Sequence, residues 1–300
     1  MNILVTGASG FIGSELCSVV PNVIRVVRQP DQLKSYKDIL IPNIDSSTSW
    51  GNSLIGIDSI IHLAGLAHNP NACDNDYKEV NVHGTLKLAH EAVKAGVARF
   101  VFVSSIGVNG TNSYNKAFLP SDIAKPHNTY AQSKYDAELG LWEISEKTGL
   151  EIVIVRPTLV YGSAAPGNFG MLANLVKHLP FLPFGLANNR RDFISVSNLV
   201  ELLVVCAKHQ SAPGNVFLAS ECNTVSTKEF VNAIASGQDR KICQIPIPVT
   251  LMRLVGLMTG KSTMIEQLFG NLEVDSSNIK EVLGWTPPYS MKDTMDMLRK

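Results

Sequence analysis

The stretch TGASGFIG, residues 6–13, decides how the chain begins to fold. It joins an apolar run at 2–6, which predicts a strand, to an apolar run at 11–20, which predicts a helix. Its glycines are spaced as GxxGxxG, and the missing side chains let the turn tighten and let the backbone approach a bound group. Free N–H groups at the start of the helix then favour an anion. The residues expected to surround that anion are Gly7, Gly10, Phe11, Ile12 and Gly13.

The position of this turn after the first strand predicts that the anion is the pyrophosphate of a dinucleotide, although the spacing differs from the standard GxGxxG. The end of the next strand, expected at 23–27, should then select the cofactor. Arg28 follows that strand and the first carboxylate comes only at Asp31, so the sequence favours NADP(H) over NAD(H). Asp45, after the third strand, is a candidate for contact with the adenine or else a helix cap.

Strand and helix patterns alternate through the first half of the chain. Apolar strands separated by helices predict an α/β fold, a Rossmann-type doubly wound parallel sheet covered by helices on both faces. The expected strands are 2–6, 23–27, 38–44, 59–63, 99–104 and 151–156, and the expected helices are 11–20, 76–95 and 130–148.

The alternation loosens after Tyr161. The expected division is an NAD(P)-binding domain at 1–165 plus about 190–222, and a smaller C-terminal substrate-binding domain at about 166–189 plus 223–300. The elements expected in this half are strands at 193–196 and 215–219, a helix at 199–208, and mostly helical structure with loops at 224–300.

Composition excludes several classes of function. Lys and Arg number 26, as do Asp and Glu, so binding of nucleic acid through bulk charge is not expected. The five cysteines form no CxxC pair and the seven histidines show no metal-ligand spacing, so we expect reduced thiols and no metal site in a cytoplasmic protein. Met1 leads directly into a strand, so no signal peptide is expected.

The most apolar late stretch, 245–258, is shorter than the ~20 residues needed to span a bilayer. It also contains Pro246, Pro248 and Arg253. No membrane span is therefore expected. A buried or interface helix is expected there, with contact at a membrane surface as the alternative.

Tyr130 and Lys134 stand in a YxxxK spacing on the helix expected at 130–148. Residues four apart share one helix face, about 6 Å apart along the axis, so the ammonium should lie near the phenol. A free tyrosine has a pKa of about 10, and a nearby ammonium, together with the positively charged nicotinamide ring of an oxidised cofactor, is expected to lower the pKa toward a usable acid or base. The fifth expected strand leads into Ser104 and Ser105. A glycine turn, a serine pair and YxxxK in this order are far less expected by chance than YxxxK alone.

These landmarks together resemble the extended short-chain dehydrogenase/reductase family, the NAD-dependent epimerases, dehydratases and reductases of nucleotide-linked sugars. The resemblance covers almost the whole chain. The matching segments are TGASGFIG (6–13), IHLAG (61–65), NVHGT (81–85), VSSIGVNG (103–110), YAQSK (130–134), VRPTLVYG (155–162), RDFISV (191–196) and LGWTPP (283–288).

The resemblance implies a role for each matching residue. Ser105 would hydrogen-bond the reacting sugar oxygen, Tyr130 would be the acid/base, and Lys134 would hold the nicotinamide ribose and tune Tyr130. Ser104 would line the nicotinamide, and Asn81 would shape the site through backbone or water contacts. The further cofactor contacts implied are Ala64, Gly65 and Pro157, and the substrate contacts implied are Arg191, at the diphosphate, with Asn168 and Lys261.

The sequence departs from the UDP-galactose 4-epimerase pattern at two places. Pro157-Thr158-Leu159 stands where those enzymes have an aromatic residue followed by Asn, and Asn109 stands in place of a tyrosine. These changes bear on recognition of the hexose and not on hydride chemistry. The stretches 179–196 and 270–288 look closer to bacterial enzymes of surface-polysaccharide synthesis, including reductases of UDP-4-keto-6-deoxy-N-acetylhexosamines.

The expected function is NAD(P)-dependent oxidoreduction at C4 of a nucleotide-linked sugar, in bacterial surface-polysaccharide precursor synthesis. A UDP-sugar 4-epimerase and a 4-ketoreductase would use the same residues; Arg28 favours the reductase, and the overall similarity favours the epimerase. A non-catalytic NADP-sensing binding protein on the same fold is the alternative from another class. The resemblance also implies a homodimer through the helices at 76–95 and 129–149.

Overall fold

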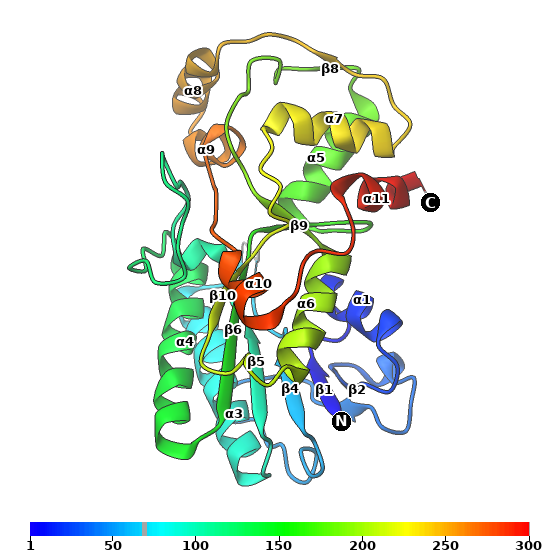
Figure 1. Cartoon of the computed structure of the whole chain (residues 1–300), viewed down its shortest axis with the longest axis vertical. Helices are drawn as coiled ribbons and strands as arrows, with labels where there is room; N and C mark the ends of the chain where they lie inside the picture. Colours follow the sequence, from blue (N-terminus) through cyan, green and yellow to red (C-terminus); the bar gives the residue numbers. More distant parts are fainter. Residues whose placement is uncertain (68–70, 300) are drawn as a thin grey trace.

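A computed structural model describes residues 1–67 and 71–299 of the chain. Its centre is a parallel sheet with the strand order β10-β6-β5-β4-β1-β2-β3 (Figure 1). The chain winds outward from β1 to one edge and from β4 to the other, so the sheet is doubly wound and the predicted Rossmann-type fold is confirmed. Its strands are β1 (Ile3–Thr6), β2 (Ile24–Val27), β3 (Ile39–Leu40), β4 (Ser59–His62), β5 (Arg99–Val103), β6 (Glu151–Pro157) and β10 (Val216–Ala219).

The strand register brings the candidate residues to one edge of the sheet. Thr6 pairs with His62, and His62 in turn pairs with Phe102. Val103 pairs with Val155 on the next strand. Because all seven strands are parallel, the segments that follow them leave from the same edge. Sheets of this kind bind ligands at this edge where the strand order reverses, here between β1 and β4, and we call this place the crevice.

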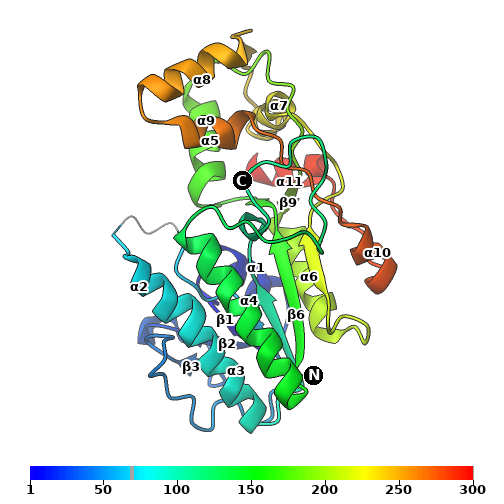
Figure 2. The same ribbon diagram turned by 90° about the vertical axis from the view of Figure 1, so that its left-hand side faces the viewer.

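Helices cover both faces of this sheet (Figures 1 and 2). On one face, Leu16 and Leu203 are fully buried against Val5. On the other, Leu88 and Leu141 are fully buried in a second apolar cluster. The first face carries α1 (Phe11–Val19), α6 (Val196–Lys208) and α10 (Ser277–Leu283), and the second carries α3 (Thr85–Lys94) and α4 (Thr129–Thr148).

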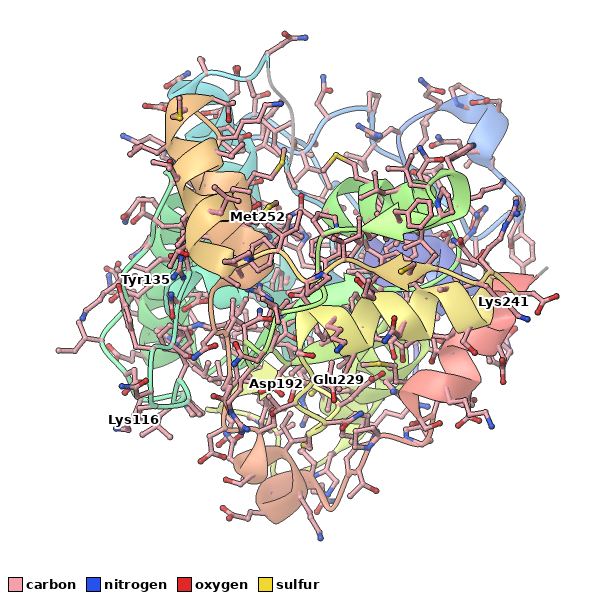
Figure 3. The ribbon with its side chains drawn as sticks, turned by 90° about the horizontal axis from the view of Figure 1, so that it is seen from above. Lys116, Tyr135, Asp192, Glu229, Lys241 and Met252 are labelled. Atoms are coloured by element: carbon pink, nitrogen blue, oxygen red, sulfur yellow. The ribbon has the colours of Figure 1, made fainter. Side chains whose placement is uncertain are left out.

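A second group of elements lies beyond the carboxyl edge of the sheet and has an aromatic core of its own (Figures 1 and 3). The rings of Phe193 and Phe230 stack there with centroids 3.8 Å apart. Two parallel strand pairs, β7–β9 and β8–β11, belong to this group. Its elements are β7 (Leu159–Tyr161), α5 (Gly167–His178), β8 (Phe181–Leu182), β9 (Phe193–Ser195), α7 (Thr227–Gly237), β11 (Cys243–Gln244), α8 (Val249–Met258), α9 (Ser262–Phe269) and α11 (Met291–Asp296).

Several expected boundaries were wrong. The third strand, expected at 38–44, is reduced to β3, because Pro42 cannot donate to a sheet ladder and β3 is the edge strand. The expectation of mostly helical structure at 224–300 is confirmed. The short strands β7, β8 and β11 had no clear sequence signal, since two or three residues carry no readable alternation.

The long helix expected at 76–95 is interrupted. The chain forms α2 (Asp74–Tyr77), then a π-helix at Lys78–Gly84, and only then α3. The widened turn brings Gly84 against the backbone after β3, where a Cβ would lie 2.7 Å from the carbonyl oxygen of Ile44. The π-helix also carries Asn81, whose side chain is buried. π-Helical turns are frequently found at functional sites.

We predict that Gly13→Ala destabilises the cofactor-free protein by about 2–4 kcal/mol, because the new Cβ would lie 2.1 Å from the carbonyl oxygen of Gly7. Gly10→Ala is the matched control, since its Cβ would lie 3.2 Å from the same oxygen and needs only a small adjustment. Urea unfolding measures both variants. Equal stability losses would contradict the close contact between α1 and the turn.

Candidate active site

The glycine turn holds β1, α1 and the segment after β4 in close contact. Gly7 has a φ of +69°, and a Cβ there would lie 2.8 Å from the backbone nitrogen of Ala64. No side chain caps α1 at Gly10, so the first N–H groups of the helix remain open to an external acceptor. The turn can therefore take an anion. The residues predicted for this role, Gly7, Gly10, Phe11, Ile12 and Gly13, all lie in the turn or at the start of α1.

The other predicted cofactor contacts lie around the same crevice. Arg28 is exposed directly after β2, and its backbone N–H donates to Gln32 Oε1 at 3.1 Å. Asp45 is half-buried and accepts a hydrogen bond from the Ser47 hydroxyl at 2.7 Å, which holds the pKa of Asp45 below its usual range. Asp45 thus organises a turn and caps no helix. Pro157 is buried at the last position of β6. The contacts of these residues with a cofactor stay predictions.

The two serines after β5 lie in different surroundings. Ser104 is buried, and its Oγ has no hydrogen-bond partner among the described residues. A buried hydroxyl without a partner is unfavourable, so Ser104 indicates a site that a ligand completes. Ser105 is half-buried, and its Oγ accepts a hydrogen bond from the Gly107 N–H at 3.1 Å. The proton of the Ser105 hydroxyl can therefore be donated to a substrate oxygen.

Lys134 is fixed deep beside β5 by the helix that carries it. Asn128 caps the start of α4 by accepting from the Ala131 N–H at 2.8 Å. From there Lys134 reaches β5, where its Nζ donates to the carbonyl oxygen of Val103 at 2.9 Å. The Nζ also lies 4.5 Å from the centroid of the Phe102 ring. This placement brings the ammonium to the strand that leads into the serine pair.

Burial shifts the pKa values of the Tyr130 phenol and the Lys134 ammonium in the chain without a cofactor. Burial raises the pKa of Tyr130 to about 12, and the neighbouring Tyr77 adds to the rise. Burial lowers the pKa of Lys134 to about 8. The lowering expected from Lys134 together with an oxidised cofactor ring stays a prediction, because in the chain without a cofactor burial of the phenol sets the pKa of Tyr130. At neutral pH Tyr130 is protonated and begins as a proton donor.

Asn81 joins the segment after β4 to the catalytic helix. Its Oδ1 accepts from the Leu66 N–H at 2.7 Å, and its Nδ2 donates to the Leu66 carbonyl at 3.0 Å and to Ser133 Oγ at 2.9 Å. Ser133 lies between the two residues of the YxxxK motif. Gly65 is enclosed by the same contacts, because a Cβ there would lie 3.1 Å from Asn81 Oδ1 and 3.3 Å from Lys134 Nζ. Asn81 therefore positions the wall of the crevice through direct hydrogen bonds.

A buried chain of hydrogen bonds starts beside the glycine turn and ends at Asn81. The Ala64 N–H donates to Thr6 Oγ1, which contacts His62 Nδ1 at 2.7 Å. His62 Nε2 contacts Thr85 Oγ1 at 3.0 Å, and Thr85 donates its proton to the Asn81 carbonyl. Since Thr85 uses its only proton there, His62 Nε2 must carry a proton and Nδ1 must accept. Burial lowers the pKa of His62 to about 3, which keeps this neutral form at ordinary pH.

Beneath Lys134 lies a buried ion pair that sequence reasoning did not assign. Arg156 Nε donates to Glu138 Oε1 at 2.9 Å, and Arg156 Nη1 donates to Asn109 Oδ1 at 2.9 Å. All three side chains are buried, and the Asn109 Nδ2 donates to the carbonyl of Leu119. Asn109 is thus part of the support of the site. Two signals were available in the sequence: Arg156 inside an otherwise apolar strand, and Glu138 one helical turn after Lys134.

The predicted substrate residues all lie around α9. Asn168 Nδ2 donates to Gln267 Oε1 at 3.2 Å, and Lys261 is exposed immediately before the helix. Arg191 is buried, and its Nη1 donates to the carbonyl oxygen of Gly270 at 2.9 Å. Burial lowers the pKa of Arg191 to about 10. The guanidinium therefore has a structural partner at the end of α9, and its contact with a diphosphate stays a prediction.

We predict that Glu138→Gln destabilises the protein by about 3–5 kcal/mol, because Arg156 would be left as an unpaired buried charge. It should also lower the pKa of Lys134 below about 8, since the Glu138 carboxylate raises that pKa. Urea unfolding and NMR titration of labelled lysine side chains measure the two effects. Glu143→Gln, which breaks the exposed pair with Lys147 on the same helix, is the control and should change neither by much. An unshifted Lys134 titration would contradict the electrostatic coupling.

Within 1–67 and 71–299, no helix is long and apolar enough to cross a membrane. No group of three or more His, Cys, Asp or Glu side chains in this part is placed to hold a metal ion. The five cysteines are unpaired thiols, and burial raises the pKa of Cys17 to about 11.

Curated relatives match nearly the full length of the chain. A UDP-glucose 4-epimerase from Vibrio cholerae is 36% identical over 97% of this chain and 92% of its own length. An N-acetyl-alpha-D-glucosaminyl-diphospho-ditrans,octacis-undecaprenol 4-epimerase from Escherichia coli O157:H7 is 26% identical over 98% of this chain and 93% of its own length.

Solved structures share the fold. MoeE5 in complex with UDP-glucose and NAD aligns with a TM-score of 0.77 at 24% identity, covering 100% of this chain and 97% of that chain. A UDP-glucose 4-epimerase from Thermotoga maritima, solved with UDP-glucose, aligns with a TM-score of 0.76 at 21% identity, covering 100% and 99%. Residues 3–219 match the NAD dependent epimerase/dehydratase family. Since this match spans the sheet, the glycine turn and the YxxxK helix, the chain belongs to the NAD-dependent epimerase/dehydratase family, as its motifs predict.

Proposed function

We propose that the chain is an NAD(P)-dependent 4-epimerase of a UDP-linked sugar. The observation that carries the proposal is the placement of Ser105 and Lys134 at the end of β5. Ser105 comes two residues after the last residue of that strand, Val103, and Lys134 Nζ donates to the Val103 carbonyl. Tyr130 lies one helical turn before Lys134 on α4. The Vibrio cholerae relative, similar over nearly its whole length, acts at C4 of UDP-glucose by its name and supports this choice.

The residues of the crevice fit a dinucleotide. The uncapped start of α1 and the glycine turn would take the pyrophosphate, and the unpartnered Ser104 hydroxyl would meet the nicotinamide end. Lys134, already directed at the carbonyl of Val103, would hold the ribose. When bound, the nicotinamide supplies hydride exchange with the sugar carbon. In the epimerase the sugar would also have to turn in the site, so that the hydride returns to the opposite face of C4. The remaining chemistry is the movement of one proton.

Tyr130 would accept or donate that proton, and Ser105 would assist by hydrogen-bonding the reacting oxygen. For oxidation of a C4 hydroxyl, Tyr130 takes the hydroxyl proton, and for reduction of a C4 ketone it gives the proton back. Ser105 donates a hydrogen bond to the same oxygen and stabilises negative charge as it develops. The phenol begins protonated at neutral pH, so the Lys134 ammonium and a positively charged cofactor ring must together lower its pKa before it can act as a base.

A 4-ketoreductase is the second candidate, and two observations favour it. The phenol of the ligand-free chain is already in the donor form that reduction needs. Arg28 stands exposed where β2 ends, a position suited to the 2′-phosphate of NADP(H), the cofactor of a reductase that exchanges it after each turnover. A role in the synthesis of surface-polysaccharide precursors fits either activity.

The second group of elements, which holds most of residues 166–189 and 223–300 together with β7 and β9, would hold the substrate. The two curated relatives act, by their names, on sugars joined to a diphosphate, one in UDP-glucose and the other in an undecaprenol-linked N-acetylglucosamine. A diphosphate needs cationic partners, and Arg191 and Lys261 lie at the two ends of α9. Asn168, bonded to the same helix, would complete this group. A homodimer through α3 and α4 is proposed from the family resemblance.

We predict that Tyr130→Phe reduces conversion of UDP-glucose to UDP-galactose by about 10²–10⁴-fold, because the phenol proton is lost from the transition state. Tyr135→Phe, on the same helix, is the control and should keep its activity. Both variants should still bind cofactor, measured by fluorescence titration. Full biological activity of a folded Tyr130→Phe protein would favour a non-catalytic NADP sensor. A wild type that consumes NADPH in proportion to product, with UDP-4-keto-6-deoxy-N-acetylglucosamine as substrate, is a ketoreductase.

We predict that Arg28→Ala weakens NADPH binding by about tenfold and leaves NADH binding unchanged, since only the former has a 2′-phosphate to pair with the guanidinium. Lys34→Ala, an exposed cation farther along the same segment, is the control and should change neither affinity. Isothermal titration with each cofactor measures the difference. A variant that binds both cofactors as the wild type does would make Arg28 a surface charge without a role in selection.

A further inference from the structure

The end of the molecule farthest from the sheet exposes an unusual amount of apolar surface. Two segments, 179–186 and 240–265, form this end, which we call the distal surface (Figures 1 and 2). Of the 22 large apolar side chains that are exposed in the described part of the chain, ten lie in these two segments. Their concentration at one end is unlike the single exposed apolar residues found on most protein surfaces.

Helix α8 contributes an ordered stripe to this surface. Leu251, Leu254, Val255 and Met258 repeat at the spacing of one helix face, and their exposed fractions are 49, 52, 47 and 80%. The opposite face is the one that packs inward. There Val249 and Met252 join the aromatic core, and a Cβ on Gly256 would lie 2.6 Å from Ile265 of α9. The helix is therefore apolar on both sides, and its outer side is directed away from the protein.

The distal surface also differs in charge from the rest of the chain. Between 240 and 265 there are four cations, Arg240, Lys241, Arg253 and Lys261, and no Asp or Glu. The segment 166–189 likewise has no Asp or Glu. The chain as a whole has a formal net charge of zero, so this end is a local excess of positive charge. Figure 3 shows Lys241 at the rim of this end and Met252 on α8.

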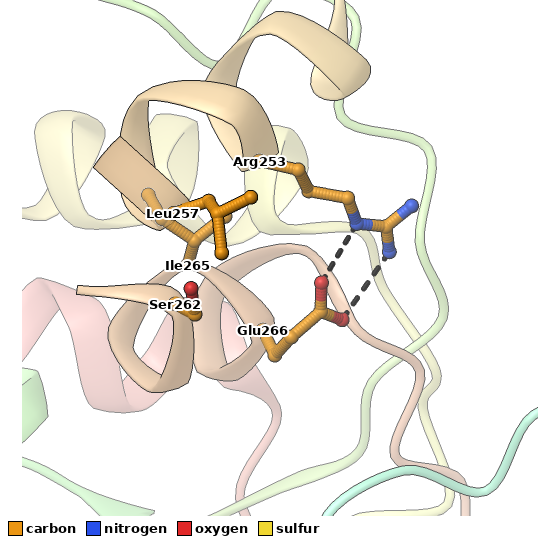
Figure 4. Close-up of a pocket in the computed structure, with 5 residues that line it drawn as sticks. All are labelled: Arg253, Leu257, Ser262, Ile265 and Glu266. Carbon is orange, nitrogen blue, oxygen red and sulfur yellow. Dashed lines mark hydrogen bonds and ion pairs between the residues drawn. The ribbon is translucent and has the colours of Figure 1, made fainter. Parts of the chain in front are cut away.

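One of these cations is neutralised within the protein. Arg253 Nε forms an ion pair with Glu266 Oε1 at 2.7 Å, closing a groove between α8 and α9 that Leu257, Ser262 and Ile265 also line (Figure 4). Arg240, Lys241 and Lys261 take part in no ion pair among residues 1–67 and 71–299. Their charges are therefore available to an external partner.

We propose that the distal surface docks onto the face of an anionic lipid bilayer, with α8 lying along the interface. A surface helix that presents leucine and methionine to the lipid, on an end of the molecule that also carries exposed lysine and arginine, has the chemistry that such an interface takes. The outer stripe would enter the acyl boundary, and Arg240 and Lys241 would meet the lipid phosphates, while Lys261 stays assigned to the substrate diphosphate. This is surface contact and requires no spanning helix.

The charges and the side chains disfavour other occupants. A second copy would bring the same cations to face one another across a two-fold axis, with no carboxylate in 240–265 to pair with them. A protein partner is usually anchored by tryptophan and tyrosine, whereas the outer stripe of α8 contains only leucine, valine and methionine. Flexible aliphatic side chains without a fixed pocket suit a fluid hydrocarbon surface. The proposal does not depend on the reaction that the enzyme performs.

The test is flotation of the full chain with vesicles of phosphatidylcholine alone and of phosphatidylcholine with an equal part of phosphatidylglycerol. Wild type should bind the anionic vesicles, bind the neutral vesicles more weakly, and lose affinity as salt rises. The double variant Leu254→Gln/Met258→Gln should bind anionic vesicles about tenfold or more weakly. The matched control Val19→Gln/Ile55→Gln changes two exposed apolar residues at other places and should bind as wild type does.

Thermal unfolding and turnover of a soluble sugar nucleotide report on the folding of each variant, because Leu254 and Met258 are exposed and neither is one of the site residues described above. A wild-type protein that floats with neither kind of vesicle would overturn the proposal. An unchanged affinity of the Leu254→Gln/Met258→Gln variant for anionic vesicles would also overturn it. Equal binding to neutral and anionic vesicles would overturn the role of charge. If the wild type instead forms a dimer without lipid, and this variant is monomeric, the distal surface is an interface between copies and the proposal fails.

Discussion

The absence of side chains at Gly7 and Gly13 is the constraint on which the rest of the structure depends. A Cβ at Gly7 would meet the backbone after β4, and a Cβ at Gly13 would meet the carbonyl of Gly7 itself. Only with both positions bare can β1, α1 and β4 approach closely enough to form the crevice at the point where the sheet reverses. The open start of α1 then faces that crevice, so the same packing that closes the core also creates the place for an anion.

The crevice is kept in shape by polar groups that are satisfied within the protein. The chain from Thr6 through His62 to Thr85 runs from the glycine turn to the carbonyl of Asn81, and the Asn81 side chain continues the link to α4. Each donor in this chain has one acceptor, so the neutral imidazole with a proton on Nε2 is the only form that satisfies all the contacts. Against this background of satisfied groups, the unpartnered Ser104 hydroxyl stands out as the point at which the described site is incomplete.

Much of this architecture could be predicted because it depends on patterns among residues close together in the sequence. Strand and helix alternation predicted the doubly wound sheet, and the turn at 6–13, the serine pair and YxxxK predicted which segments meet at its edge. What escaped prediction depends on contacts between distant segments. The π-helix at 78–84 forms where Gly84 meets Ile44, and the pairing of Arg156 with Glu138 joins a strand to a helix.

The Tyr130 pKa of the chain without a cofactor could not be predicted for a related reason. Spacing along a helix gives the position of Lys134 relative to the phenol, but it does not give the burial of either group. In the folded chain desolvation is the largest influence on both pKa values, and it moves them toward the neutral forms. The catalytic pair is thus arranged by sequence and tuned by burial, and the charge that would reverse the shift in Tyr130 has to come from what binds in the crevice.

Helix α9 connects this chemistry to the outer surface. On its inner side it contacts the residues proposed for the substrate, since Gln267 accepts from Asn168 and the Gly270 carbonyl accepts from Arg191. On its outer side it packs against α8, where Gly256 leaves no space beside Ile265 and Arg253 pairs with Glu266. Protein interiors resist local compression, so α8 cannot shift without moving α9. The proposed membrane contact through α8 and the proposed substrate residues beside α9 therefore share one packed pair of helices, which would link the distal surface to the site.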